Sequence, residues 1–392
     1  MHILFLSRWQ PFPPNNGSKL RIYNLLKIIC QVHQVTLLSF REPTDNYPDP
    51  GQYFDNLVDV QTIVYKPFEP HNWRSRLGFF SLRPRMVIDT YSSEMETVIR
   101  KVLQTSKIDL VIASQFDMAM YRPLFQHLPA LYEEIEIGIF IQRVQNSNSL
   151  KQRFRNQLTW LKHRNYMGQL LSSYQAATVV SEQEAALVRQ SYPHRNQIKI
   201  VPNCVDLTEY ENFHTTPIPQ RMIFTGSFRY EPNYQAMRWF VDQVFPAVLS
   251  NFPDVQLIIT GDPAGKDFSM FPNVTQTGMV DDIRPWVAQS WISLSPIHLG
   301  GGTRLKILEA MGLKSAVVST SKGAEGLDLQ AGEHYLVGDS PQKFADAVCR
   351  LLGEPDLREQ LVAKAYQRVA EKYDWTQQAP SILNILDQIT TN

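Results

Sequence analysis

Residues 291–311 read WISLSPIHLGGGTRLKILEAM and hold a strand pattern, a glycine loop and a helix pattern in succession. The apolar run 291–295 is typical of a buried strand, and the apolar spacing over 303–311 is typical of a helix. In a parallel sheet, a strand that runs through glycines into a helix opens the loop where α/β proteins bind ligands. This segment therefore predicts an open α/β sheet with a ligand loop after residue 295.

The same alternation of short apolar runs and helix-period segments continues along the chain. Strands are predicted at Ile3–Leu6, Gln34–Phe40, Asp109–Ala113, Ala177–Val180, Ile198–Val201, Arg221–Thr225, Val255–Thr260, Trp291–Ser295 and Ala316–Ser319. Helices are predicted at Lys19–Cys30, Asn233–Leu249, Thr303–Met311, Pro341–Leu352 and Trp375–Thr390. Buried strands that alternate with helices indicate parallel, doubly wound sheets. Two such series predict two Rossmann-like domains.

The boundary between the domains is predicted in the polar, proline-rich stretch 202–219. We assign residues 1–203 to an N-terminal domain and 204–375 to a C-terminal domain. The last helix, 376–392, is expected to pack on the first domain. A chain of 392 residues exceeds what one core usually supports, which agrees with two domains.

Composition excludes several classes of protein. The chain has 38 basic and 38 acidic residues, so no net charge favours nucleic acid. Cys30, Cys204 and Cys349 lie far apart, and neither they nor the nine histidines show metal spacing, so we predict no metal site. The first apolar run is too short for a signal peptide, and no stretch approaches the roughly 18 apolar residues of a membrane span. A cytoplasmic location is expected, at most peripheral at the inner face of the membrane.

The glycine loop is suited to a diphosphate. Glycines let an anion approach the backbone closely, and the N–H groups and dipole at the start of the following helix favour negative charge. Arg304 and Lys306 add two cations there, against the dipole, which a bound anion would compensate. Glu309, one turn after Lys306, could accept hydrogen bonds from two ribose hydroxyls. A surface ion pair between Lys306 and Glu309 is the structural alternative.

Other motifs are less informative. The stretch Gly261–Asp267 lacks the last residue of a phosphate-binding P-loop and favours a tight turn. Gly17 and Ser18, before the first helix, could contact an anion or simply cap the helix. Ser181 and Glu184 fit a capping box, with Glu184 reaching back to the N-cap.

Two basic stretches with aromatic residues contain no acidic residue. Residues 72–88 (NWRSRLGFFSLRPRMVI) contain four arginines, and residues 151–164 (KQRFRNQLTWLKHR) contain five Lys or Arg residues. Such segments can dock on anionic lipid or on a lipid-linked acceptor, and long solvated helices look similar.

Several quoted segments resemble one family. They are IVPNCVD (200–206), FTGSFRYEPN (224–233), ITGD (259–262), VTQTGMVDDIRPWVAQSWISLSP (274–296) and GGGTRLKILEAMGLKSAVVSTSKGAEGL (300–327). In this order and spacing the chain resembles the GT-B-fold retaining glycosyltransferases of family 4, which include many exopolysaccharide and lipopolysaccharide sugar transferases. The resemblance implies two Rossmann-like domains facing across a cleft. The first would hold the acceptor and the second the nucleotide-sugar.

The resemblance also implies roles for residues. Glu309 matches the second acid of the family's Glu-x7-Glu motif, which holds the donor ribose, and Gly301 stands where the first acid would be. Ser227 stands where a basic residue often follows Gly226, and we expect Arg304 and Lys306 to replace that charge. The expected catalytic set is Arg304, Lys306 and Glu309. The expected donor-binding set is Gly17, Gly226, Ser227, Arg229, Gly261, Met279, Val280, Gly300, Gly301, Gly302, Thr303 and Leu305.

The activity that the resemblance implies is transfer of a sugar, with retention, from a nucleotide-diphosphate donor to a glycan or lipid-linked acceptor. It would need no metal and no cofactor. Two alternatives remain from the sequence: a nucleotide-sugar 2-epimerase of the same fold, and a non-catalytic scaffold, which the missing first acid at Gly301 suggests.

Overall fold

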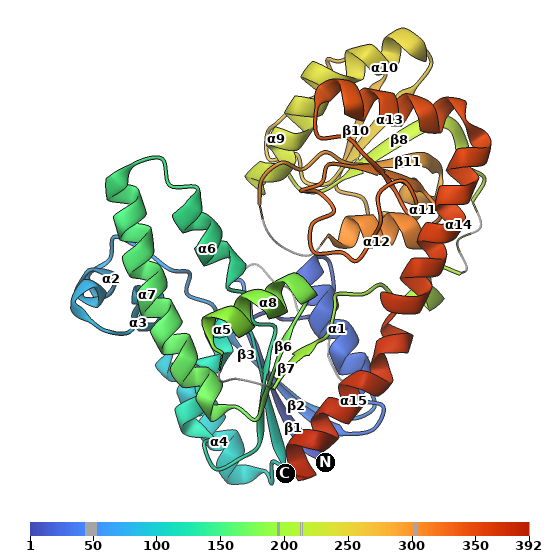
Figure 1. Ribbon diagram of the computed structural model, residues 1–392. Coiled ribbons are helices and arrows are strands. Elements are labelled where there is room, and N and C mark those ends of the chain that lie inside the picture. The colour runs from blue at the N-terminus through green and yellow to red at the C-terminus, as the bar shows by residue number, and fades with distance from the viewer. Residues whose placement is uncertain (44–52, 194–196, 212, 214, 301–303, 392) are drawn as a thin grey trace. The chain divides into compact units, whose positions relative to one another are not determined.

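The computed structural model describes residues 1–43, 53–193, 197–211, 213, 215–300 and 304–391. The chain forms two compact units, Met1–Pro202 with Ala379–Asn392, and Asn203–Gln378 (Figure 1). This division lies one residue before the predicted boundary at 203. Both units contain a parallel sheet with helices around it, as the alternation of strands and helices predicts.

The first domain is built on a seven-stranded parallel sheet in the order β3-β2-β1-β4-β5-β6-β7. Its strands are β1 (His2–Ser7), β2 (Gln34–Arg41), β3 (Leu57–Val64), β4 (Leu110–Ser114), β5 (Ala130–Glu133), β6 (Ala176–Val179) and β7 (Ile198–Ile200). Its helices are α1 (Gly17–Ile29), α2 (Trp73–Leu77), α3 (Arg85–Thr90), α4 (Ser93–Thr105), α5 (Phe116–Ala119), α6 (Gly138–Gln145), α7 (Leu150–Ser173) and α8 (Glu182–Ser191), with 3₁₀ turns at Gly78–Phe80 and Arg122–Leu124.

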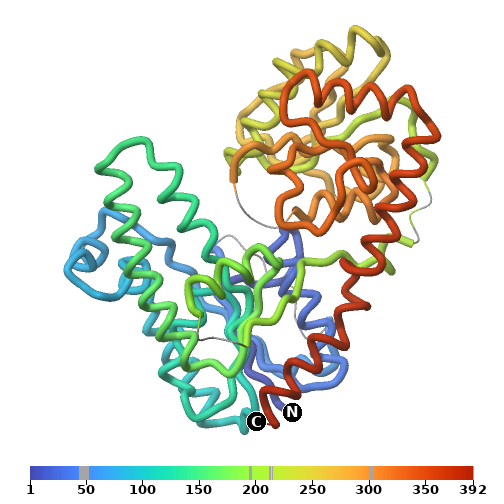
Figure 2. The backbone as a smooth tube through the Cα atoms, viewed as in Figure 1, coloured from blue at the N-terminus to red at the C-terminus, as the bar shows by residue number. Residues whose placement is uncertain are grey.

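Both faces of this sheet are buried by helices. Successive residues of a strand point to opposite faces, so each strand contributes side chains to both. Leu4 and Leu6 of β1 belong to one apolar cluster, which also contains residues of α4 and α7. Phe5 faces the other side, where it meets Leu25 of α1 and Leu386 of α15 (Trp375–Thr391). In Figure 2 the end of the last helix lies beside α1, near the start of the chain.

The second domain is built on a six-stranded parallel sheet in the order β10-β9-β8-β11-β12-β13. Its strands are β8 (Ile218–Thr225), β9 (Gln256–Thr260), β10 (Val274–Gly278), β11 (Ser290–Ser295), β12 (Ala316–Ser319) and β13 (Leu336–Val337). Its helices are α9 (Glu231–Trp239), α10 (Phe245–Asn251), α11 (Arg284–Ala288), α12 (Leu305–Gly312), α13 (Pro341–Gly353) and α14 (Pro355–Lys372), with a 3₁₀ turn at Leu207–Glu209 and a π-helical turn at Phe240–Val244 between α9 and α10. Figure 1 shows α9, α10 and α13 on one face of the sheet and α11 and α12 on the other.

Each sheet reverses its strand order once, between β1 and β4 in the first domain and between β8 and β11 in the second. Loops diverge from the sheet at such a switch point and leave a crevice beyond the carboxyl ends of the strands. The two switch points are therefore the first places to look for ligand-binding residues.

Two local predictions need correction. Ser181 caps α8, since its hydroxyl accepts the Glu184 N–H at 3.1 Å, but the Glu184 carboxylate does not reach back. It instead accepts the N–H groups of Ile137 and Gly138, at the start of α6. The helix predicted from Thr303 begins at Leu305, and Arg304 precedes it as the N-cap with a non-helical backbone.

None of the helices that the structure describes is both long and apolar enough to cross a membrane.

Candidate active site

Two glycine turns lie at the switch point of the second domain, and together they are called the floor of the candidate site. Gly226 follows β8 with φ +149° and Gly261 follows β9 with φ +124°, both in a backbone region that disfavours a side chain. A Cβ on Gly261 would lie 2.6 Å from the backbone carbon and oxygen of Gly226. The two turns therefore touch backbone to backbone, which exposes peptide groups rather than side chains at the ends of two strands.

Lys306, in the first turn of α12, lies directly against this floor. A Cβ on Gly226 would be 3.2 Å from the Lys306 Nζ, and the ammonium lies 4.4 Å from the centre of the Phe224 ring. Burial and, to a smaller extent, the charge of Arg304 lower the pKa of Lys306 to about 7, and Glu309 opposes them. A partly buried ammonium beside exposed peptide groups is suited to an anionic ligand.

Asn233, which the sequence reasoning did not single out, holds this ammonium. Its Nδ2 donates to the Ser227 carbonyl at 2.9 Å, which leaves its Oδ1 to accept from the Lys306 Nζ at 3.1 Å. The amide thus fixes both the turn after β8 and the lysine. The only signal in the sequence is that Asn233 ends the FTGSFRYEPN segment, in the first turn of the helix that follows a glycine turn.

Helix α12 is buried on almost every side, including the predicted apolar stripe of Leu305, Leu308 and Met311. Lys306 and Glu309 are the residues of this helix that remain partly exposed. No ion pair within 4.0 Å joins them among the described residues, so the surface-pair alternative is wrong. Burial raises the pKa of the Glu309 carboxyl and Lys306 opposes this.

Arg304 acts as a clamp between two loops. Its Nη2 donates to the Gly300 carbonyl at 3.2 Å and to the Lys322 carbonyl at 3.0 Å, and it lies 3.9 Å from a carboxylate oxygen of Glu325. Only 8% of its side chain is exposed. It therefore orders the loops after β11 and β12, and its charge reaches the site from within the protein.

Gly300 is the one described glycine of the loop after β11. Its φ is +97°, and a Cβ there would lie 2.4 Å from the Tyr230 hydroxyl. Tyr230 comes from the turn that precedes α9, so the two loops on either side of the switch point meet at this glycine. The predicted residues Gly301, Gly302 and Thr303 lie outside the described residues.

The other predicted donor residues are scattered. Arg229 is largely exposed and pairs with Asp262 of the tight turn after β9, whereas Ser227 accepts the Arg229 N–H at 3.2 Å. Met279 is 74% exposed beyond β10, and Val280 follows it. Leu305 is buried, so only its backbone could contact a ligand. Gly17 belongs to the first domain, where Asn16 rather than Gly17 caps α1.

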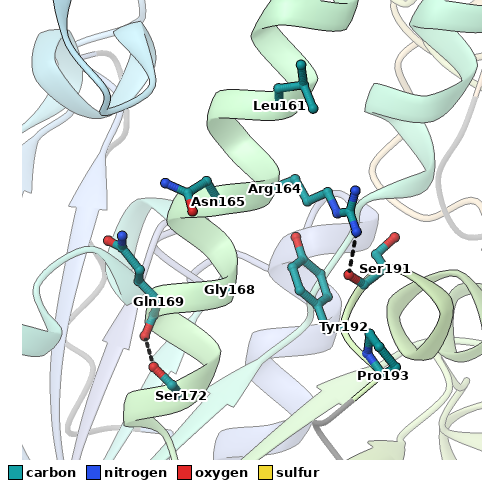
Figure 3. A pocket seen from close by; sticks show the side chains of 9 residues that line it. All are labelled: Leu161, Arg164, Asn165, Gly168, Gln169, Ser172, Ser191, Tyr192 and Pro193. Carbon is teal, nitrogen blue, oxygen red and sulfur yellow. Dashed lines mark hydrogen bonds between the residues drawn. The ribbon is translucent and has the colours of Figure 1, made fainter.

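A groove in the first domain lies away from both switch points. It runs along the second half of α7 to the end of α8, with Arg164, Gln169 and Tyr192 on its walls (Figure 3). Arg164 donates to the Ser191 carbonyl at 3.3 Å there. Because α8 starts at the carboxyl end of β6, its last residues lie toward the amino ends of the strands. Ligands of open α/β sheets bind at the opposite edge, so this groove is not the candidate site.

The described residues contain no group of three or more His, Cys, Asp or Glu side chains arranged to hold a metal ion.

Comparisons with known proteins agree with this geometry. Residues 219–354 match the profile of the family Glycosyl transferases group 1. An uncharacterized 44.6 kDa protein in the cps region of Klebsiella pneumoniae is 20% identical over 95% of this chain and 96% of its own. The phosphatidyl-myo-inositol mannosyltransferase of Mycobacterium tuberculosis is 27% identical over 48% of this chain and 53% of its own.

Solved structures match the whole chain. Sucrose-phosphate synthase from Thermosynechococcus elongatus superposes with a TM-score of 0.70 at 15% identity over 100% of both chains. HepE of Anabaena, solved in complex with UDP and glucose, superposes with a TM-score of 0.67 at 14% identity over 99% of this chain and 100% of its own. Two Rossmann-like domains with parallel sheets of this kind define the GT-B fold. The chain therefore has the GT-B fold, and the segment 219–354 of its second domain is similar to Glycosyl transferases group 1.

Proposed function

We propose that the protein transfers a sugar from a nucleoside-diphosphate donor, held at the switch point of the second domain, to an acceptor held by the first. The ammonium of Lys306 carries this proposal. It is partly buried against the Gly226 turn, oriented by Asn233, and has no carboxylate within ion-pairing distance among the described residues. A cation in such surroundings is stabilised by an anion, and a diphosphate is the anion that glycine turns admit.

The difficulty in the reaction is the negative charge that develops on the departing diphosphate. Preorganised cations and N–H dipoles aimed at that charge are usually the largest contribution to catalysis. Lys306, the N–H groups at the start of α12 and, from behind, Arg304 supply them without a metal ion or cofactor. Arg229 contributes less, because it is exposed and already paired with Asp262.

Glu309 would bind the ribose of the donor. Its carboxylate lies one helical turn from Lys306, is partly exposed, and takes part in none of the hydrogen bonds or ion pairs that join described residues. A carboxylate can accept hydrogen bonds from two neighbouring hydroxyls at once. HepE, a structure of the same fold, binds UDP.

The transfer would proceed with retention of the anomeric configuration. In this mechanism the acceptor oxygen bonds to the anomeric carbon from the side of the leaving group. The bond from that carbon to the phosphate oxygen breaks, and the departing phosphate takes the proton of the acceptor hydroxyl. No enzyme base is then required, and the resemblance to retaining transferases supports this choice.

A surface of the first domain fits an acceptor anchored in a membrane. We define it as residues 73–83 and 150–161, where Phe80 is 93% exposed and Phe154 72% exposed, among arginines and lysines and no acidic residue. Lys162, directly after the second segment, donates its Nζ to the Phe79 carbonyl at 2.8 Å, which joins this end of the second segment to the first. Exposed aromatic and basic residues together bind anionic lipid surfaces.

The relatives point to the same kind of acceptor. One is named for a cps region, and another is named a phosphatidyl-myo-inositol mannosyltransferase. We therefore propose a lipid-linked glycan as the acceptor and polysaccharide biosynthesis as the process. Co-sedimentation with vesicles tests the surface. Phosphatidylglycerol vesicles should retain the protein, phosphatidylcholine vesicles should not, and changing Phe80 and Phe154 to Ser should release it. Equal binding to both vesicles would refute the proposed surface.

Calorimetry with UDP and GDP tests the donor site. Wild type should bind at least one of them, and Lys306→Met should weaken that binding at least about tenfold, because a charge-assisted contact contributes roughly 1.5–3 kcal/mol. Lys364→Met, on the exposed face of α14, is the matched control. Undiminished binding by the Lys306 variant would overturn the assignment. Release of nucleotide that does not depend on added acceptor would favour an epimerase instead.

A further inference from the structure

The carboxyl edge of the first domain's sheet holds two strained residues side by side. Gln115 follows β4 with φ +65°, and Glu134 follows the neighbouring strand β5 with φ +60°. A side chain in this left-handed region costs roughly 1–2 kcal/mol, and such residues persist where the surroundings fix them, often at functional sites. Neither residue is a glycine or an asparagine, which adopt this region most easily.

Hydrogen bonds fix both residues in these conformations. The Gln115 N–H donates to the Glu133 carbonyl at 2.8 Å, and the Glu134 N–H donates to the Thr178 hydroxyl at 2.9 Å. The two side chains then meet, because Gln115 Nε2 donates to Glu134 Oε2 at 2.7 Å. Gln115 Oε1 and Glu134 Oε1 take part in no hydrogen bond between described residues. The pair thus presents two further oxygens at a partly exposed edge.

The neighbouring Glu133 has a different role, because both of its carboxylate oxygens accept hydrogen bonds from buried side chains. Its carboxylate accepts from Arg21 Nε at 2.7 Å and from the Ser114 hydroxyl at 2.5 Å, and all three side chains are buried. Glu134 is therefore the carboxyl that faces outward. Burial raises its pKa to about 7, with Arg21 opposing and Glu133 adding to the rise. Near neutral pH it can both donate and accept a hydrogen bond.

Arg8 follows β1 at the same edge of the sheet, with its guanidinium directed to residues that follow β2 and β3. Its side chain is only 8% exposed, its guanidinium lies 3.1 Å from the centre of the Tyr65 ring, and it pairs with Glu42 at 3.2 Å. Its Nη1 is buried without a hydrogen-bond partner among the described residues. Burial raises the pKa of Asp117, just after β4, and Arg8 opposes that rise, so these groups act on one another. A buried donor without a partner requires an acceptor from water or from a ligand.

We infer that this edge is a sugar-binding site, in which the Glu134–Gln115 pair binds hydroxyl groups of the acceptor. The inference rests on the proposed function, since it names the site that would hold the acceptor. A neutral polyhydroxyl ligand fits because the two oxygens of the pair can accept from hydroxyl groups, and the Glu134 carboxyl can also donate to them when protonated. An anionic ligand does not fit, because Asp117, Glu133, Glu134 and Glu136 would repel it.

The test is binding of simple sugars to the full chain, followed by saturation-transfer NMR. The probes are the methyl glycosides of glucose, galactose, mannose and rhamnose. At least one should bind wild type, and Glu134→Asn should weaken it at least about tenfold, because asparagine tolerates the left-handed backbone but has a shorter side chain. Glu134→Gln should restore most of the binding. Glu94→Asn, at an exposed carboxyl in the first turn of α4, is the matched control.

The inference is overturned if none of the four glycosides binds wild type, or if Glu134→Asn binds them as wild type does. Should Glu134→Asn fail to fold, Gln115→Asn provides the same test from the other side of the pair. Binding of UDP and GDP is measured in every variant and should not change. If wild type binds neither UDP nor GDP, the donor proposal is refuted. Sugar binding is a separate measurement and decides only the acceptor site.

Discussion

The two sheets share a strand order around their switch points, yet the residues after the strands differ in kind. In the second domain β8 and β9 end at Gly226 and Gly261, whose backbones touch, and Lys306 lies on them. In the first domain β4 and β5 end at Gln115 and Glu134, which keep their side chains at positive φ. One edge exposes peptide groups and a cation, and the other exposes carboxyl and amide groups.

This difference suits the two edges to the two ligands proposed for them. A diphosphate is best bound by N–H groups and positive charge, which a glycine turn leaves accessible. Sugar hydroxyls are best bound by groups that donate and accept hydrogen bonds, which side chains supply. Under these proposals, the residue directly after each strand selects the ligand, and the sheet positions that residue.

The largest effect is expected from Gly261→Ala, which would disrupt the backbone contact between the Gly226 and Gly261 turns of the second domain. The new Cβ would be strained at φ +124° and would clash with the Gly226 backbone at 2.6 Å. We expect a loss of roughly 3 kcal/mol and nucleotide binding weakened more than about a hundredfold. Thermal melting and calorimetry measure both. Gly265→Ala is the control, because its φ is +76° but nothing lies within 4 Å of its Cβ. Equal effects of the two changes would contradict the backbone contact.

The next effect concerns the acidic edge, through Glu134→Gln. The pKa of Glu134 is about 7 in the folded chain against 4.5 when unperturbed. Between these values the unfolded state loses a proton that the folded state keeps, so wild type loses stability as pH rises, by up to roughly 3 kcal/mol. The variant lacks this loss. The free energy of unfolding of the variant minus that of wild type should therefore be larger at pH 8 than at pH 5. Urea unfolding at the two pH values measures this difference, with Glu94→Gln, on the exposed face of α4, as the control. A difference that does not change with pH would refute the raised pKa of Glu134.

A smaller effect is expected from the titration of Lys306 at the basic edge. Its pKa of about 7 means that the free protein loses this charge as pH rises from 7 to 8. Affinity for UDP-glucose, whose diphosphate does not titrate in this range, should fall about fivefold over that unit. Lys306→Arg should bind with little dependence on pH, because arginine stays charged. Calorimetry at both pH values tests this, and a wild-type affinity that does not depend on pH would contradict it.

The smallest effect should come from Arg229→Ala. Arg229 is exposed and already paired with Asp262, so its removal should change nucleotide affinity by less than about twofold. A loss of affinity as large as that of Lys306→Met would show that the positive charge of this edge includes the turn that carries Arg229.

Much of the second domain could be predicted from sequence, because local patterns determine it. Strand β11 and helix α12 follow from apolar spacing, and the buried stripe of α12 lies where that spacing places it. The backbone of Arg304 could not be predicted, because its ψ of 44° depends on the carbonyls of Gly300 and Lys322 that hold its side chain.

The contacts that complete each edge were missed for a physical reason. Asn233 reaches Lys306 across 73 residues of sequence, and no spacing rule connects a helix start to a lysine that far along the chain. Strand β5 has only four residues, ALYE, and ends in a charged residue, so a search for apolar runs does not detect it. Without that strand Glu134 could not be placed beside Gln115.

The contact between Tyr230 and Gly300 bears on how such sequences diverge. The tyrosine hydroxyl occupies the space that a side chain at position 300 would need, 2.4 Å from its Cβ. A homologue with any larger residue at position 300 must therefore have a smaller residue at 230, or a turn shifted away from it. The two positions should co-vary, although 70 residues separate them, and an alignment of relatives would show whether the pairing marks a subgroup among them.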